Sequence, residues 1–249
     1  MPKSFTPFSH ILINLARLIR PDEVTFSGVN STLPMLACLL AKQAYAFDFT
    51  WLNVAGGVDA VPEGPIPLSS GDPALMHRSA AVFANEDFYD LCTRGGMDLC
   101  FLGASQIDAT GAINNSAIGD WHAPKVRLPG GGGSAVMMPT LPRAATWRTE
   151  HSTRTLVNRL FFQTAKGNLQ HVVTPLAVFD KRDGRLALEF HNPEISIDDI
   201  RRITGFEFDA RDAQPSPLPT KAELDALGKL DPDGQFERDA AIAYPEFAA

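Results

Sequence analysis

Apolar residues near the start of the chain follow helical spacing, and the apolar residues that come later fall into short runs. The first pattern predicts an amphipathic helix over residues 7–20. A β-prone run over residues 23–27 leads through a glycine turn to a second predicted helix over residues 33–44, with Ser31 as its cap. A further apolar run over residues 49–54 completes a strand–helix–strand order, which is typical of an α/β unit.

The middle of the chain continues this alternation. Residues 60–75 are rich in proline and lack periodicity, so we predict an exposed excursion over the domain. Asn85 is a candidate cap for a helix that Gly95-Gly96 ends, and residues 99–102 form another short apolar strand. Short apolar strands between helices favour the α/β class, with a three-layer α/β/α architecture and a mostly parallel sheet.

The second half of the chain adds strands and two short helices. An apolar path resumes over residues 134–142. The predicted strands cover residues 155–163, 171–179 and 186–190. Asp183-Gly184 has the turn chemistry of a β-hairpin ahead of the last of these strands. Cap residues at Ser196 and Thr220 predict the starts of two helices.

A long stretch without periodicity, residues 102–134, separates the two halves. It ends in four consecutive glycines, Gly130–Gly133, followed by Ser134. Such a loop inside a compact domain is uncommon unless it is functional. Glycine lets backbone N–H groups approach a ligand because no Cβ intervenes. We therefore predict a site for an anionic or carbonyl-bearing ligand, built largely from main chain.

Composition narrows the class of protein. The formal net charge of −7 argues against a nucleic-acid surface, which needs a basic patch. Cys38, Cys92 and Cys100 stand in apolar contexts and are predicted to be buried thiols, and no Cys or His spacing suggests a metal. The N-terminus does not resemble a signal peptide, and no stretch approaches the roughly 20 apolar residues of a membrane span. We expect a cytoplasmic protein without a nucleic-acid or membrane partner.

Two motifs in the long loop carry a family resemblance. Residues 103–108 read GASQID, with Asn114 following, and residues 118–127 read IGDWHAPKVR ahead of the glycines. Together they resemble the second (B) subunit of class I CoA-transferases, in particular the glutaconate CoA-transferase branch. The resemblance extends from the first helix to about Phe208. It predicts a domain over residues 1–212 that is similar to this B subunit, followed by a C-terminal extension over residues 213–249. From the composition of this extension, we expect its last dozen residues to lie loosely or to dock on a partner.

The resemblance implies the CoA-transferase fold, an obligate complex with a separately encoded A subunit, and an active site between the two subunits. The assembly it implies is (AB)2 or larger. Coenzyme A enters as part of the acyl-CoA substrate, and no permanently bound cofactor is expected. A role in catabolism fits this family.

The family nucleophile is missing from this chain. In class I CoA-transferases a B-subunit glutamate attacks the acyl-CoA carbonyl, and the resemblance places this position at Val54. Valine cannot act as a nucleophile or base. Three interpretations follow. The chain belongs to the branch that hydrolyses CoA thioesters, including ring-opening hydrolases in which an A-subunit acid acts; or Asp59 or Glu63 substitutes in a transferase; or the chain is a non-catalytic scaffold. We favour hydrolysis.

Site residues are carried over from the family pattern. The residues expected to stabilise the thioester oxyanion are Asn114, Gly132 and Gly133. Those expected to contact coenzyme A are Gly103, Gln106, Gly130, Gly131 and Ser134. Those expected to line the substrate pocket are Val54, Ala55 and Gly56.

Several of these positions have a second interpretation. Gln106 and Asp108 are expected to brace the loop rather than touch a ligand. Lys125 and Arg127 either meet CoA phosphates or are solvated or subunit-facing charges. His122 is treated as structural. A Rossmann dinucleotide site is a weak rival, because the run is GGGGS rather than G-x-G-x-x-G.

Overall fold

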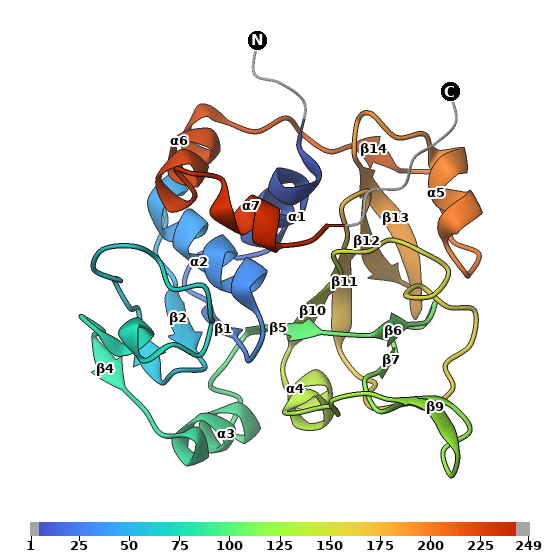
Figure 1. Cartoon of the computed structure of the whole chain (residues 1–249), viewed down its shortest axis with the longest axis horizontal. Helices are drawn as coiled ribbons and strands as arrows, with labels where there is room; N and C mark the ends of the chain where they lie inside the picture. Colours follow the sequence, from blue (N-terminus) through green and yellow to red (C-terminus); the bar gives the residue numbers. More distant parts are fainter. Residues whose placement is uncertain (1–4, 243–249) are drawn as a thin grey trace.

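A computed structural model describes residues 5–242 of the chain, and a ten-stranded mixed sheet forms its centre (Figure 1). Five neighbouring strands in the middle of this sheet run parallel. In spatial order they are β11 (Leu169–Val173), β10 (Arg143–Trp147), β5 (Leu99–Gly103), β1 (Val24–Ser27) and β2 (Thr50–Asn53). The predicted strands near residues 23–27, 49–54 and 99–102 are thereby confirmed.

Antiparallel strands extend both edges of this parallel centre. On one side lie β12 (Ala177–Arg182) and β13 (Arg185–His191), with β14 (Gln214–Pro215) parallel to β13. On the other side lie β3 (Gly57–Val58) and β4 (Ala81–Val82). Asp183 and Gly184 form the turn between β12 and β13, which confirms the predicted hairpin.

Helices pack on both faces of the sheet, and each face has its own core. One face carries α1 (Pro7–Arg17), α2 (Thr32–Ala44), α6 (Lys221–Leu230) and α7 (Gln235–Asp239). The other carries α3 (Asn85–Thr93), α4 (Ser134–Thr140), α5 (Ile197–Ile203) and the pair β6 (Gln106–Ile107) and β7 (Ile113–Asn114). A short hairpin of β8 (Ala117–Gly119) and β9 (Pro124–Arg127) and a 3₁₀ turn, η1 (Pro73–Met76), complete the elements. The predicted α/β/α architecture is confirmed.

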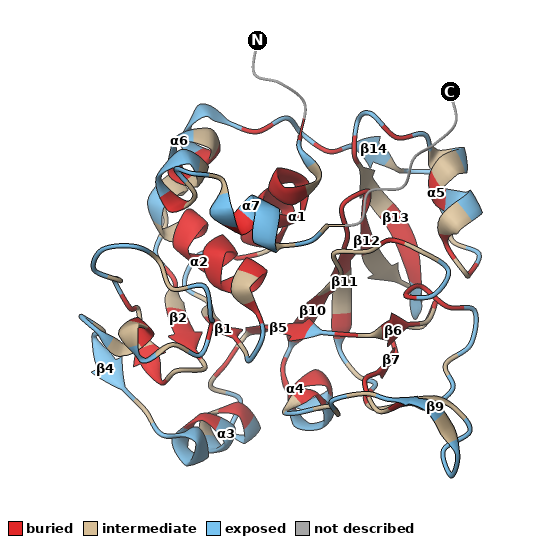
Figure 2. Ribbon diagram, viewed as in Figure 1, coloured by how far each residue is buried: buried red, intermediate tan, exposed pale blue. Residues whose placement is uncertain are grey.

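Strand β5 explains why both faces are covered. Leu99 and Phe101 belong to one core, whereas Cys100 and Leu102 belong to the other, and all four are buried. Because successive side chains of a strand point to opposite faces, a continuous apolar run requires packing layers on both sides. Figure 2 shows this burial concentrated along α1, α2 and the central strands.

Two predicted strands are wrong. Residues 155–163 form turns with one isolated bridge at Leu156, because the Thr155 hydroxyl bonds the carbonyl groups of Glu150 and Ser152 instead of leaving the backbone extended. Residues 171–179 form parts of two strands, β11 and β12. The Thr174 hydroxyl accepts the Ala177 N–H at 3.0 Å and reverses the chain between them.

The helix starts differ from prediction at two places. Ser31 occupies the cap position of α2, but its hydroxyl donates to the Val29 carbonyl at 3.1 Å instead of capping the helix. Asn85 is the first residue of α3, and Ala84 is the cap residue, whose N–H donates to Asp87. Residues 134–140 of the predicted apolar path form helix α4.

The proline-rich excursion is partly buried rather than wholly exposed. Ser70 is 2% exposed, and its hydroxyl accepts the Ser31 N–H and donates to the Gly28 carbonyl, each at 3.0 Å. Leu75 in η1 is fully buried. The excursion therefore holds the turn that follows β1 in place.

The caps at Ser196 and Thr220 are confirmed, and the second of these begins helix α6. The Thr220 hydroxyl accepts the Glu223 N–H, and the Glu223 carboxylate accepts the Thr220 N–H at 2.7 Å. Glu223 also pairs with Arg17 of α1 at 2.8 Å and accepts the Tyr45 hydroxyl at 2.9 Å. The division of the chain after residue 212 stays a prediction, and residues 243–249 of the last dozen lie outside the described part.

Candidate active site

A cavity of about 470 Å³ opens at the carboxyl ends of four parallel strands. Its lining includes the turn after β1, Val54 after β2, Gly103 at the end of β5, and Trp147 at the end of β10. Ligands of open α/β sheets bind at this edge, because the loops that follow parallel strands gather there. Val54 and the four consecutive glycines, Gly130–Gly133, line this same cavity.

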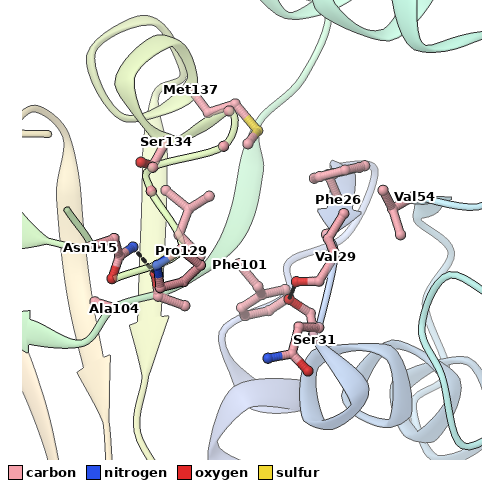
Figure 3. A pocket seen from close by; sticks show the side chains of 18 of the residues that line it. Phe26, Val29, Ser31, Val54, Phe101, Ala104, Asn115, Pro129, Ser134 and Met137 are labelled. Carbon is pink, nitrogen blue, oxygen red and sulfur yellow. Dashed lines mark hydrogen bonds between the residues drawn. The ribbon is translucent and has the colours of Figure 1, made fainter. Parts of the chain in front are cut away.

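The wall beside β1 and β2 is mainly apolar. Phe26 packs on Phe88 with ring centroids 4.1 Å apart, and Val54 lies next to this pair in the lining. The Val54 N–H donates to the Ser27 carbonyl at 3.1 Å, which continues the strand pairing by one residue. Figure 3 shows Phe26, Val29, Ser31 and Val54 on one side of the hollow.

The opposite wall is the glycine loop, residues 129–134, together with Asn115, Ala104 and Met137 (Figure 3). Gly130 and Gly132 have φ values of +100° and +51°, a region that side chains other than glycine rarely adopt. A Cβ at Gly131 would lie 2.6 Å from the Thr164 methyl group, and a Cβ at Gly133 would lie 2.6 Å from Met137 Cε. Backbone conformation therefore favours glycine at positions 130 and 132, and space favours it at position 131, whereas the Met137 methyl group near Gly133 ends a flexible side chain.

The glycine loop presents free donors. Among the described residues, nothing accepts a hydrogen bond from the backbone N–H groups of Gly131, Gly132 and Gly133. The hydroxyl of Ser134 is also buried without a partner in this part of the chain. The loop itself is held by the Gly130 N–H, which donates to the Asn115 carbonyl at 2.7 Å. Unpaired backbone N–H groups at a cavity can stabilise a developing oxyanion.

Asn114 does not line the cavity. It is fully buried, and its side-chain amide donates to Gln106 Oε1 at 2.9 Å and to the Ala117 carbonyl at 2.7 Å. Its neighbour Asn115 lines the cavity instead. Asn115 Nδ2 donates to the Gly103 carbonyl at 2.8 Å, and its Oδ1 accepts the Ser105 N–H at 2.6 Å.

The residues expected to brace the loop have bonds that fit this role. Gln106 is buried and joins Asn114 to the Arg154 carbonyl, and it does not line the cavity. Asp108 Oδ1 accepts the Thr110 N–H at 2.8 Å in a local turn. Asp120 accepts the His122 N–H at 2.7 Å in the turn between β8 and β9.

Ala55 and Gly56 follow Val54 but are not part of the lining. Gly56 has a φ of +107°, and a Cβ there would lie 2.7 Å from the Phe83 carbonyl oxygen. The tight turn that Gly56 permits directs the chain from β2 to β3 and leaves Val54 at the cavity.

No carboxylate lines the cavity among residues 5–242. Asp59 accepts the Trp51 N–H at 2.8 Å and pairs with Lys42 at 2.9 Å, so it braces β2. Glu63 is exposed and pairs with Arg78 at 3.4 Å. Lys125 and Arg127 also lie outside the lining, and the Arg127 guanidinium sits 4.6 Å from the centre of the Trp121 ring.

Sequence reasoning missed Asn115, Trp147 and Arg148, all of which line the cavity. Trp147 is the last residue of β10 and Arg148 follows it, and the sequence pattern predicts no element over residues 143–148. Asn115 has no signal apart from its neighbour Asn114. Burial lowers the pKa of the Arg148 guanidinium, and the Glu150 carboxylate opposes that effect. Arginine nevertheless keeps its charge in proteins.

None of the three cysteines is part of the cavity lining. No group of three or more His, Cys, Asp or Glu side chains is arranged to hold a metal ion among the described residues. Cys38, Cys92 and Cys100 are free and buried, and burial raises the pKa of the Cys38 and Cys100 thiols. None of the helices over residues 5–242 has the length and apolar character needed to cross a bilayer.

Comparison with known proteins defines the class. The Coenzyme A transferase family model matches residues 10–202, so the chain belongs to the Coenzyme A transferase family. The chain is 29% identical to the B subunit of 3-oxoadipate CoA-transferase from Pseudomonas knackmussii, over 87% of this chain and 89% of that protein. It is 26% identical to the B subunit of glutaconate CoA-transferase from Acidaminococcus fermentans, over 90% and 92% of the two chains.

Solved structures share the fold. The decarboxylase AibA/AibB matches with a TM-score of 0.87 and 28% identity, covering 94% of this chain and 98% of that one. The glutaconate coenzyme A-transferase of Acidaminococcus fermentans matches with a TM-score of 0.83 and 24% identity, over 97% of this chain and 98% of that one. The resemblance read from the loop motifs is confirmed by the family match.

Proposed function

We propose that this chain is the B subunit of a heteromeric enzyme that hydrolyses an acyl-CoA thioester. One observation carries the proposal: Val54 occupies the cavity wall opposite the glycine loop, and no carboxylate among the described residues lines that cavity. A transferase needs a nucleophile that accepts the acyl group, whereas hydrolysis needs only an activated water.

The free N–H groups of the glycine loop give this chain its chemical role. The backbone amides of Gly132 and Gly133 receive the thioester carbonyl oxygen and stabilise the negative charge that forms when water attacks. Asn115 fixes the distance between this loop and the end of β5 through its bonds to Gly103 and Ser105. One oxyanion donor typically contributes about 3 kcal/mol to lowering a barrier.

The base that activates water comes from a partner. The curated relatives are named as B subunits, which supports an A subunit for this chain, with two or more AB pairs in the assembly. A carboxylate of that A subunit, facing Val54 across the interface, takes the proton from water. Coenzyme A leaves as the thiol and the acyl group as a free acid. A ring-opening reaction of a cyclic keto-acyl-CoA differs in the bond that breaks: water attacks the ring ketone, a ring C–C bond breaks to give a carboxylic acid and a carbanion that is then protonated, and CoA stays attached as the thioester.

Decarboxylation of an acyl-CoA is a second candidate. It is favoured by the match to the decarboxylase AibA/AibB at 28% identity and a TM-score of 0.87. Transfer of CoA, the activity named for the curated relatives, requires a displaced carboxylate. Asp59 and Glu63 are the candidates, but both bond elsewhere.

The test is an assay of the chain co-expressed with its A subunit. We expect free CoA to appear from an acyl-CoA without any acceptor acid, and only when both subunits are present. Acceptor-dependent transfer with inactivation by hydroxylamine or borohydride supports a covalent carboxylate instead. Release of CO2 with the thioester intact supports decarboxylation. Failure of acyl-CoA to bind or thermally stabilise the complex supports a scaffold.

A further inference from the structure

The hairpin of β8 and β9 lies outside the cavity and takes no part in the proposed hydrolysis. Its strands form a two-stranded sheet of their own, separate from the ten-stranded sheet. The hairpin projects from the edge of the molecule below β7 (Figure 1). Because a two-stranded hairpin is marginally stable at best when it stands alone in water, we expect contacts with another surface to hold it in place.

Apolar side chains gather on this hairpin and on the segment beside it. Trp121, in the turn between the strands, stacks on Phe162 with ring centroids 4.4 Å apart. Trp121, Val126 and Phe161 are nevertheless 45%, 46% and 62% exposed. Large apolar residues that are exposed in one region mark interaction sites. We define the hairpin surface by its members, which are Trp121, Val126, Arg127, Phe161 and Phe162.

The hairpin surface is also positively charged. The Arg127 guanidinium lies 4.6 Å from the centre of the Trp121 ring. Lys125, Arg127 and Arg159 are exposed, and no carboxylate within residues 5–242 pairs with them. The Asp120 carboxylate accepts backbone N–H groups of its own turn. A two-fold contact between two copies of this surface would bring like charges together, so the charge favours a different partner with an acidic face.

The base of the hairpin runs directly into the wall of the cavity. Pro129 lines the cavity two residues after the end of β9. The segment that contains Phe161 is joined to the same wall, because the Thr164 hydroxyl accepts the Asn115 N–H at 2.8 Å and bonds the Ser116 hydroxyl at 2.7 Å. A partner that covers the hairpin surface therefore reaches the rim of the cavity, where the proposed hydrolysis needs a partner's carboxylate.

We propose that the hairpin surface is a docking site for the A subunit, and that the A-subunit face covering it is apolar with acidic side chains around it. Trp121 and Arg127 supply the main contacts, since tryptophan and arginine are enriched among the residues that dominate binding energy. This inference rests on the proposed function for the presence of an A subunit, and it does not depend on hydrolysis.

Photo-crosslinking in the complex with the A subunit locates the contact. p-Benzoylphenylalanine replaces Phe161 and, as a control, Leu218, which is 55% exposed shortly before α6. We expect irradiation to join this chain to the A subunit from position 161 and not from position 218. A crosslink from position 161 to a second copy of this chain overturns the proposal, and so does the absence of any crosslink.

The affinity of the complex gives a second readout. Arg127→Glu reverses one charge of the hairpin surface, and Lys229→Glu makes the same change of charge at an exposed position of α6. We expect Arg127→Glu to raise the Kd of the complex about 10- to 100-fold and Lys229→Glu to change it by less than about twofold. Mass photometry over a dilution series measures both values. Equal Kd values for the two folded variants would count against the proposal.

These outcomes are separate from those that test the proposed hydrolysis. A crosslink from position 161 to the A subunit, in a complex that releases no CoA from an acyl-CoA, supports the docking site and contradicts hydrolysis. Release of CoA by a complex that crosslinks to nothing from position 161 supports hydrolysis and overturns the docking site.

Discussion

At the scale of single residues, two features characterise the cavity: a valine at position 54 in place of the family glutamate, and backbone N–H groups in the glycine loop. Val54 gives the wall an apolar surface, and the glycine loop opposite gives N–H groups that are unpaired within the described residues. Neither feature has chemical meaning alone. Under the proposed hydrolysis, they form a cavity that binds a polarised carbonyl, and no carboxylate among the described residues lines it.

Substitution of Gly131 tests whether the glycine loop is tightly packed. We expect Gly131→Ala to lower the free energy of unfolding by about 1–3 kcal/mol, because its Cβ would lie 2.6 Å from the Thr164 methyl group. Gly103→Ala is the matched control, since nothing lies within 4 Å of a Cβ there. Urea unfolding of both variants measures the difference. Equal midpoints would show that the loop is looser than its packing indicates.

Asn115 offers a second test at this scale. Asn115→Asp keeps an acceptor for the Ser105 N–H but loses the donor to the Gly103 carbonyl. We expect about a tenfold or greater loss of kcat for thioester cleavage, with a smaller change in KM, because the glycine loop moves relative to β5. Steady-state kinetics of the two-subunit enzyme measures this. Thr110→Ala, in the nearby turn away from the cavity, serves as the control and should retain kcat.

Some of these cavity residues could be predicted from the sequence, and Asn115 could not. The family motifs identify the glycines and the missing glutamate at Val54, because those positions are marked by spacing. The same motifs point to Asn114, whereas Asn115 lines the cavity. Two adjacent asparagines carry the same local signal, and only tertiary hydrogen bonds decide which side chain faces inward.

At the scale of elements, buried polar side chains join segments that are far apart in sequence. His10 of α1 bonds the Thr174 carbonyl at 3.2 Å and the Ser216 hydroxyl at 2.8 Å. His151 bonds the hydroxyls of Thr174 and Thr204. These contacts tie the turn between β11 and β12 to a helix on each face of the sheet.

The two histidines make stability depend on pH. Burial lowers the pKa of His10 to about 4 and that of His151 to about 3, from an ordinary value of 6.5. The unfolded chain therefore binds protons first, so the stabilisation is complete above pH 6.5 and declines as the pH falls toward those values. At pH 5 we expect a loss of about 2 kcal/mol for each histidine, from 1.36 kcal/mol per pH unit.

Denaturant unfolding at pH 7.5 and pH 5 measures this dependence. His151→Gln should reduce the difference between the two pH values, whereas His77→Gln, at an exposed position, should leave it unchanged. The interpretation fails if wild type is equally stable at both pH values.

Helix α6 is docked by one buried carboxylate. Although burial raises its pKa, Arg17 and the Thr220 N–H hold the pKa of Glu223 below the ordinary value. We expect Glu223→Ala to lower the free energy of unfolding by about 3 kcal/mol, because Arg17 and Tyr45 both lose their partner. Asp225→Ala, which removes an exposed pair with Lys221, should change it by less than about 1 kcal/mol. Similar thermal shifts in the two variants would contradict this.

Element boundaries were predictable where the signal is local. The capping box at Thr220 and the hairpin at Asp183 depend on a few adjacent residues, and both are confirmed. The strand predicted over residues 155–163 is wrong because Thr155 bonds nearby carbonyl groups, a choice that apolar periodicity does not record.

At the scale of the whole molecule, parallel strands bring four loops to one edge of the sheet. Val54 and Arg148 are far apart in sequence, yet both face one cavity because β2 and β10 end at the same edge. The order of strands follows from long-range packing, so a sequence pattern alone cannot supply it. The fold could be predicted from the family resemblance. The position of Arg148 at the cavity could not, because it depends on the pairing of β10 with β5.

In the proposed hydrolysis, water rather than a carboxylate of this chain attacks the thioester. Turnover of an acyl-CoA by the two-subunit enzyme in H2¹⁸O, followed by mass spectrometry of the product and of both polypeptides, distinguishes the two attacking groups. We expect one ¹⁸O atom in the released acid and none in the side chains of this chain. Incorporation of ¹⁸O into Asp59, Glu63 or another carboxylate of this chain would reveal an acyl-enzyme and overturn the proposed hydrolysis.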